Sequence, residues 1–134
     1  MLMNAGVAII PNVKIAVVDD DSSIRKLIVT ALMYCVNRDV LSFDGGTAAW
    51  DYIKNADGID IVLTDVEMPD MDGFELVSRV KRHYPDTICV VISGNASNEK
   101  AAQDLGADAF LAKPFKINDL FDIVQTYVVG DAPY

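Results

Sequence analysis

Acidic side chains stand at two places where an apolar run of the sequence stops. Asp19, Asp20 and Asp21 come directly after the run at 14–18, and Asp65 follows a second run. Carboxylates that converge repel one another unless a hard divalent cation lies among them. Ligand sets made only of oxygen favour Mg²⁺ over zinc or copper. If folding brings these acids together, the sequence therefore predicts a Mg²⁺ site.

Two further polar side chains end apolar runs, and they are suited to bind an anion. Ser93 follows the run at 88–92, and Lys113 follows the run at 109–112. An ammonium group opposite a metal ion makes a pocket for a phosphoryl group, to which a hydroxyl can donate a hydrogen bond. A carboxylate can itself attack phosphorus, and the transfer then needs mainly positioning and charge neutralisation. No general base for a hydroxyl substrate is evident, which favours phosphorylation of a carboxylate of this chain.

The elements that must position these side chains alternate between strand and helix patterns. Apolar runs predict five strands at 14–18, 40–43, 59–64, 88–92 and 109–112. Helical spacing of apolar residues predicts helices between and after them, at 24–35, 47–55, 74–84, 98–105 and 117–128. We expect Ser22 or Ser23 to cap the first helix and Asn118 to cap the last. Asp72 is expected to be a turn or cap residue, and so is Asp70.

This alternation predicts an α/β fold, a doubly wound five-stranded parallel sheet with helices on both faces. The expected strand order is the flavodoxin-like 2-1-3-4-5. Ligands of such sheets bind beyond the carboxyl ends of the strands, where the winding direction reverses. That rule gathers the polar residues named above at one edge: Asp19, Asp20, Asp21, Asp65, Ser93 and Lys113.

Composition limits the classes of partner. The chain of 134 residues predicts one domain at 14–129, with a leader at 1–13 and a tail at 130–134. A net charge of -9 argues against direct nucleic-acid binding by this segment. No segment is long and apolar enough to suggest a membrane span. Cys35 and Cys89 are expected to be reduced, buried thiols of a cytoplasmic protein.

Four segments together resemble the receiver domain of two-component response regulators. They are Val17–Asp21, Leu63–Gly73, Val91–Gly94 and Lys113–Phe115. They occur in the family's order, and the resemblance covers residues 14–128, nearly the whole chain. The segment Asp-x-x-Met-Pro-x-Met-Asp-Gly, at 65–73, is the most specific of the four.

The resemblance implies a role for each residue of the predicted edge. Asp65 would accept the phosphoryl group, with Mg²⁺ held by Asp20 directly, by Asp19 through water and by the main-chain carbonyl of Glu67. Lys113 would bind the phosphoryl group, and the Lys113–Pro114 bond would be cis.

The resemblance also implies a switch. Ser93 would turn toward the phosphoryl group, and Phe110 would move between exposed and buried positions. The donor would be a histidine kinase or a histidine phosphotransfer protein. The output would be a change in partner binding at the surface of the fourth helix, fifth strand and fifth helix, toward an unknown downstream protein or domain. Such a chain is not an enzyme with a separate substrate.

Several alternatives remain open at this point. A phosphatase or mutase with an aspartyl nucleophile would place a second acid where Glu67 stands, and a receiver that no longer depends on phosphate would keep the fold alone. Asp21 is expected to be a solvated acid at a helix start rather than a ligand. His83 is expected at the surface, and Phe110 can equally be an ordinary core residue.

Overall fold

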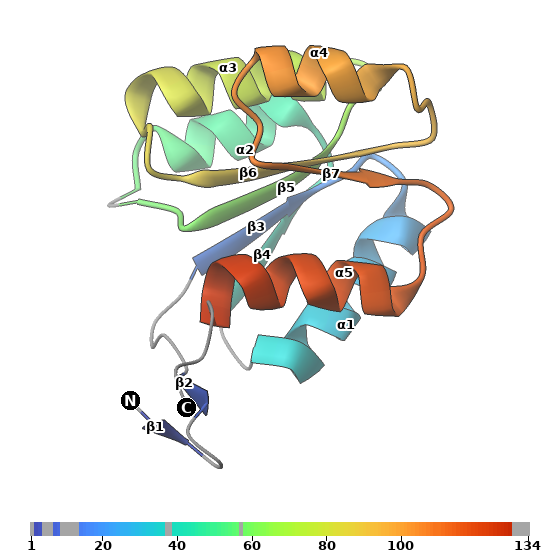
Figure 1. Ribbon diagram of the computed structural model, residues 1–134. Helices are drawn as coiled ribbons and strands as arrows, with labels where there is room; N and C mark the ends of the chain where they lie inside the picture. The colour runs from blue at the N-terminus through green and yellow to red at the C-terminus, as the bar shows by residue number, and fades with distance from the viewer. Residues whose placement is uncertain (1, 4–6, 9–13, 37–38, 57, 130–134) are drawn as a thin grey trace.

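The fold is built on a parallel five-stranded sheet, seen edge-on in the computed structural model (Figure 1). The structure describes residues 2–3, 7–8, 14–36, 39–56 and 58–129. The strand order β4-β3-β5-β6-β7 is the predicted 2-1-3-4-5, counted along the chain from β3. The strands are β3 (Lys14–Val18), β4 (Asp39–Phe43), β5 (Ile61–Asp65), β6 (Ile88–Ser93) and β7 (Ala109–Ala112).

Helices cover both faces of this sheet, which confirms the doubly wound architecture. Three of them pack on one face and two on the other (Figure 1). The first group is α2 (Gly46–Ile53), α3 (Gly73–His83) and α4 (Asn98–Asp104). The second is α1 (Ser22–Val36) and α5 (Ile117–Val124), and α5 continues into a π-helical segment, η1 (Gln125–Val129).

The two cores come from the alternation of side chains along each strand. In β3, Ile15 and Val17 pack with α1 and α5, whereas Ala16 and Val18 pack with α2 and α3. Successive strand side chains point to opposite faces, so a strand buried on both faces has no polar position. This is why β3 appears in the sequence as an apolar run, which ends where Asp19 follows Val18.

The start of α1 differs from the prediction. Asp21 caps the helix, because its Oδ1 accepts hydrogen bonds from the backbone N–H of Ser23 (2.9 Å) and Ile24 (3.2 Å). Ser22 is already the first helical residue, so neither Ser22 nor Ser23 is the cap. Aspartate and serine cap equally well, and pattern alone does not choose between neighbours.

The start of α5 also differs from the prediction. The helix begins at Ile117, with Lys116 in the cap position, so Asn118 is not the cap. The Asp119 carboxylate accepts a hydrogen bond from the Lys116 backbone N–H (3.2 Å) and closes this end of the helix instead. For α3 the prediction is confirmed: the Asp72 carboxylate accepts from the Glu75 N–H at 2.8 Å.

The structure describes the two ends of the chain only in part. Leu2–Met3 (β1) and Val7–Ala8 (β2) pair as a separate antiparallel sheet, and the rest of the predicted leader and the tail lie outside the described residues. The domain limits 14–129 therefore stay a prediction.

Cys89 is free and buried, and burial raises its pKa to about 12, so its thiol stays protonated. The side chain of Cys35 lies outside the described residues.

No helix in the part of the chain that the structure describes is both long enough and apolar enough to cross a bilayer.

Asp70 links the loop after β5 to the start of α2. Its Oδ2 accepts a hydrogen bond from the Thr47 backbone N–H (3.0 Å), so it caps a helix 23 residues earlier in the chain. A side chain at Gly45 would meet the Asp70 carboxylate at 2.9 Å, so glycine permits this close approach. Hydrogen bonds from the Thr47 hydroxyl, and from the Met71 and Thr47 N–H groups, lower the pKa of Asp70 to about 2.

Asp70→Ala is expected to lower the melting temperature at pH 7 by a few degrees, because the start of α2 loses its acceptor. An acid whose pKa is lowered on folding stabilises the folded state at pH values above its ordinary pKa, which is 3.8. This stability is lost as the pH falls through the lowered pKa of about 2. The gap between wild type and variant should therefore narrow between these values in thermal unfolding followed by circular dichroism. Asp86→Ala, at an exposed acid in the α3–β6 loop, is the control. A gap that does not change with pH would contradict the assignment.

Candidate functional site

Three carboxylates meet at the carboxyl ends of β3 and β5. Each of Asp19, Asp20 and Asp65 offers an oxygen, and these oxygens all lie within 4.8 Å of one another. The two strands are neighbours, with Val18 paired to Thr64, so the residues that follow these two converge. Asp19 is 1% exposed, Asp65 is half-buried and Asp20 is exposed. The predicted gathering of the acids is confirmed for these three residues.

Lys113 reaches into the same cluster from the end of β7. Its Nζ lies 3.4 Å from Asp19 Oδ2 and 3.4 Å from Asp65 Oδ1. The cluster has two more negative charges than positive ones when all four groups are ionised. The Lys113–Pro114 peptide bond is cis, as predicted. A cation thus already bridges two acids of the cluster, and the remaining charge matches a divalent ion.

Two contacts join Asp19 to the start of α1. Asp19 Oδ1 accepts from the Asp21 N–H (2.9 Å), and Arg25 Nη1 donates to the Asp19 carbonyl oxygen (2.6 Å). Arg25 lies one turn into α1, so this helix holds the strand end in place. Apart from its position in the first turns of a helix that starts at the site, no sequence pattern singles out Arg25.

Asp65 is a perturbed acid. Burial raises its pKa above the ordinary value, the positive charge of Lys113 opposes this, and the negative charge of Asp19 adds to it. Its Oδ1 also accepts a hydrogen bond from the Val66 N–H (2.9 Å). The carboxylate is therefore partly desolvated, beside both a cation and a second carboxylate. Such an acid gains from a metal ion, because the ion offsets the loss of water and the repulsion together.

The loop after Asp65 approaches its backbone closely. The Gly73 N–H donates to the Val66 carbonyl (2.8 Å), and a side chain at Gly73 would lie 2.0 Å from the Asp65 carbonyl oxygen. Only glycine fits there without a backbone shift. The glycine of the 65–73 segment therefore fixes where the chain leaves Asp65 and enters α3.

The donor set fits Mg²⁺. Asp19, Asp20 and Asp65 supply only carboxylate oxygens, one of the three acids is exposed, and that leaves room for water ligands. The main-chain carbonyl of Glu67 as a further ligand stays a prediction. The Asp21 carboxylate is used as the cap of α1, which agrees with its expected structural role.

Ser93 is buried, 3% exposed, at the end of β6, and its carbonyl accepts from the Lys113 N–H (2.8 Å). Its hydroxyl is bound elsewhere: Oγ accepts from the Asn95 N–H (3.0 Å) and from Asn98 Nδ2 (3.0 Å). Within the described part of the chain, no hydrogen bond joins Ser93 Oγ to Asp65 or to the Lys113 ammonium. The structure thus places Ser93 on the predicted edge, with its hydroxyl held by the start of α4. No sequence pattern predicted a role for Asn98 in holding Ser93.

Phe110 is half-buried in β7 and faces α4. It lines a small hollow together with residues of α4 and of the α4–β7 loop, among them Glu99, Ala102 and Gln103. Its ring packs against the core and also lines this hollow. Packing against the core fits an ordinary core residue, and the adjacent hollow fits a ring that moves.

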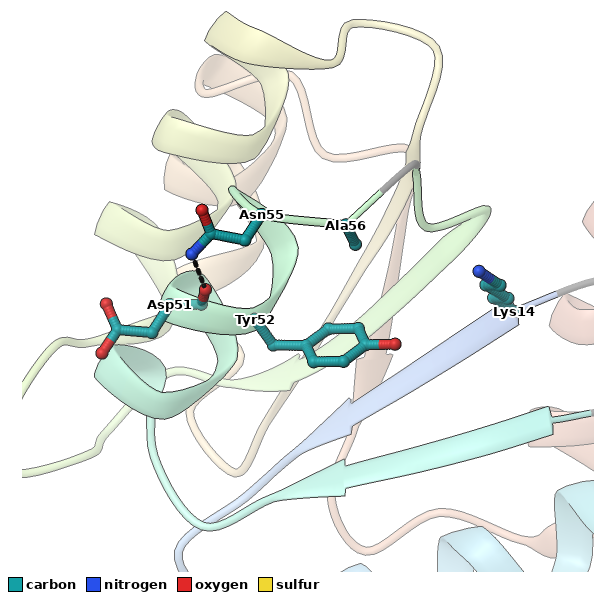
Figure 2. A pocket seen from close by; sticks show the side chains of 5 residues that line it. All are labelled: Lys14, Asp51, Tyr52, Asn55 and Ala56. Carbon is teal, nitrogen blue, oxygen red and sulfur yellow. Dashed lines mark hydrogen bonds between the residues drawn. The ribbon is translucent and has the colours of Figure 1, made fainter.

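A groove lies away from this site, near the start of β3 (Figure 2). Lys14 and the end of α2 line it, and Asn55 Nδ2 donates to the Asp51 carbonyl (2.9 Å). Lys14 begins the strand that Asp19 follows, so the groove is at the opposite end of the sheet from the acids. It contributes no residue to the acid cluster.

Known proteins with similar sequences identify the family of this chain. The family model for the response regulator receiver domain matches residues 15–125. A chemotaxis protein CheY homolog from Campylobacter jejuni is 34% identical over 106 residues, which are 76% of this chain and 82% of that protein. The DNA-binding transcriptional regulator NtrC of Azospirillum brasilense is 31% identical over 121 residues, 89% of this chain but only 25% of that protein.

A solved structure shows the same fold. The chemotaxis protein CheY4 of Vibrio cholerae superposes with a TM-score of 0.77 at 28% identity, covering 86% of this chain and 98% of that one. The match therefore covers most of the chain rather than the site alone.

Proposed function

Since the chain belongs to the response regulator receiver domain family of two-component systems, we propose that it is a phosphorylation-controlled switch whose phosphoacceptor is Asp65. The observation that carries the proposal is Lys113 Nζ, 3.4 Å from carboxylate oxygens of both Asp19 and Asp65. In a site that binds only a cation, a lysine would oppose binding. A phosphoryl group on Asp65 would instead be stabilised by the lysine, because this anion needs positive charge on more than one side.

Each residue of the cluster has a defined part in this proposal. Asp65 attacks phosphorus with a carboxylate oxygen, the new P–O bond forms as the bond to the donor's leaving group breaks, and that group departs with the electron pair. Lys113 shifts from pairing carboxylates to binding the phosphoryl oxygens. Asp19 and Asp20, with Asp65 and the Glu67 carbonyl, would hold Mg²⁺, which supplies charge neutralisation when bound.

The donor in the proposal is a histidine kinase or a histidine phosphotransfer protein, and the chain catalyses only its own phosphorylation and dephosphorylation. The response passes through Ser93 and Phe110 to the surface formed by α4, β7 and α5, where an unknown downstream protein or domain binds. The hollow that Phe110 shares with α4 supports this route, because a ring movement there must change how α4 packs. Ligand-dependent changes of this kind shift populations between two states.

Two further parts of the proposal concern location and partners. We place the exchange in the cytoplasm, where a free buried thiol such as Cys89 stays reduced. The net charge of -9 supports a protein partner rather than nucleic acid for this segment.

Intact-mass spectrometry after incubation with acetyl phosphate and Mg²⁺ tests the proposal. We expect the mass to rise by one phosphoryl group, and we expect none of this rise when a chelator removes Mg²⁺. Borohydride reduction of the product followed by peptide mapping should place the modification on Asp65 and on no other acid. Modification elsewhere, or no modification by acetyl phosphate or any small phosphodonor, would contradict the proposal.

A further inference from the structure

The Ser93 hydroxyl is committed to the start of α4 rather than to the acid cluster. It accepts two hydrogen bonds at 3.0 Å, one from the Asn95 backbone N–H and one from Asn98 Nδ2. A hydroxyl has two acceptor positions and one proton to donate. Both acceptor positions are therefore filled, whereas the proton has only the Asn95 carbonyl at 3.4 Å, a long contact. The least satisfied part of this hydroxyl is the proton, which is the part an anion would take.

The two contacts that hold the hydroxyl differ in kind. The Asn95 contact comes from the main chain, so almost any residue there would make it. The Asn98 contact comes from a side chain, and among the described residues Asn98 supplies the one side chain bonded to Ser93 Oγ. Asn98 is half-buried and is the first residue of α4. The strength of the hold on Ser93 therefore depends on the residue type at position 98.

We propose that Asn98 is a positioning residue: it holds the Ser93 hydroxyl on α4 in the unmodified protein and so sets how readily that hydroxyl turns to an anion at Asp65. This inference rests on the proposed function. Without the Asn98 amide, the nearly buried Ser93 oxygen loses one donor in the unmodified state, which raises the free energy of that state. The anion-bound state, in which the hydroxyl has turned away, loses nothing.

The same bond ties the first turn of α4 to the sheet. This helix has only seven residues and buries only Ala102. Ser97, at its cap position, makes no side-chain cap bond; its hydroxyl donates to Asn95 Oδ1 at 2.6 Å. The Asn98–Ser93 bond thus joins this end of the helix directly to the end of β6. When Ser93 turns away, α4 loses that anchor, and the surface beside Phe110 can change.

Calorimetric titration of the full chain with beryllofluoride, in saturating Mg²⁺, measures the proposed effect. Asn98→Ala should bind about 2- to 10-fold more tightly than wild type, which is the range expected for loss of one hydrogen bond from the unbound state. Asn98→Asp should bind more weakly, because a carboxylate only accepts and would take the proton that the anion needs. Lys100→Ala, at an exposed position of the same helix, is the matched control and should not change affinity.

Ser93→Ala separates an action through Ser93 from a general effect on α4. In that background, Asn98→Ala should leave beryllofluoride affinity unchanged, and any effect of Asn98→Asp there measures its charge alone. A second readout needs neither metal nor anion: amide hydrogen exchange in the first turn of α4 should be faster in Asn98→Ala than in wild type.

Wild-type affinity in Asn98→Ala, or an equal gain in the presence and absence of the Ser93 hydroxyl, would overturn this inference and leave the proposed function intact. A wild-type protein that binds no beryllofluoride in Mg²⁺ would overturn the proposed function, and this inference with it.

Discussion

Asp65→Asn is expected to abolish covalent labelling by acetyl phosphate completely. The amide lacks the carboxylate oxygen that attacks phosphorus, and it removes one of three negative charges that would hold Mg²⁺. Asparagine has nearly the shape of aspartate, so packing around β5 should not change. The measurement is intact-mass spectrometry of variant and wild type under identical donor and Mg²⁺ concentrations.

Asp51→Asn is the matched control for this substitution. Asp51 is an exposed acid of α2 at the groove near the start of β3, at the opposite end of the sheet from the cluster. It should label as wild type does. Full labelling of Asp65→Asn, or loss of labelling in Asp51→Asn, would show that the modified group is not the Asp65 carboxylate.

Although Asp65→Asn should abolish labelling, it is expected to stabilise the folded protein when Mg²⁺ is absent. Burial, together with the charge of Asp19, raises the pKa of Asp65 despite the opposing effect of Lys113. An acid whose pKa is raised on folding binds more protons folded than unfolded, so stability falls as the pH rises from the ordinary value of 3.8 through the raised one. Without Mg²⁺ at neutral pH, Asp65→Asn should therefore melt a few degrees higher than wild type.

This gain in melting temperature should vanish below the ordinary pKa, where the Asp65 carboxyl is protonated in both states. It should also shrink when Mg²⁺ is added, because the ion stabilises the wild-type cluster more than the variant. Melting curves over pH with and without Mg²⁺ test both statements. A variant that is less stable than wild type at neutral pH without Mg²⁺ would contradict the account of a strained, ion-dependent cluster.

The edge of the sheet could be predicted because strand ends are visible in the sequence. An apolar run that stops at a polar residue indicates a strand end, so Asp19 and Lys113 mark where β3 and β7 stop, and Asp65 is the last residue of β5. Parallel strands put these ends at the same edge of the sheet, so the topology predicts that Lys113 lies near the acids, whereas its two contacts at 3.4 Å are known only from the structure. The family resemblance then singled out Asp65 among acids that the residues themselves left equivalent.

What escaped prediction depends on contacts between loops rather than on periodicity. Asp70 caps α2 rather than its own turn, and this needs the path of two loops that are 23 residues apart in the chain. Asn98 meets Ser93 only because the loop after β6 folds back on itself, and nothing in the spacing of apolar residues specifies that path. Asp21 was correctly placed at a helix start, but the cap was wrongly assigned to Ser22 or Ser23, because neighbouring Asp and Ser residues compete for one cap position.

Lys113→Met is expected to change three properties of the protein in different directions, and this combination makes it diagnostic. Labelling by acetyl phosphate should slow by about 100-fold or more, because the developing charge on the phosphoryl oxygens loses a preorganised cation. Without Mg²⁺, the free energy of unfolding should fall by about 2 kcal/mol, because Asp19 and Asp65 lose their counter-charge.

The third property is Mg²⁺ affinity, which should rise in Lys113→Met. In the wild-type protein, the ammonium competes with the metal for the same carboxylates. A positive charge that contacts the same carboxylates opposes the binding of a divalent cation, so we expect the loss of Lys113 to raise Mg²⁺ affinity by about tenfold or more. Calorimetric titration with Mg²⁺ measures it, and Lys116→Met, an exposed lysine of the same loop, is the control.

A lysine that served only to neutralise the apo cluster would give a different pattern. Its loss would lower stability and raise Mg²⁺ affinity, but labelling in saturating Mg²⁺ would be normal, because the metal would replace the missing charge. Slow labelling despite tighter metal binding therefore separates a group that binds the anion from one that only balances the acids. The position of Lys113 between Asp19 and Asp65 allows both tasks in turn, and the opposite signs of these effects are what the proposed switch requires.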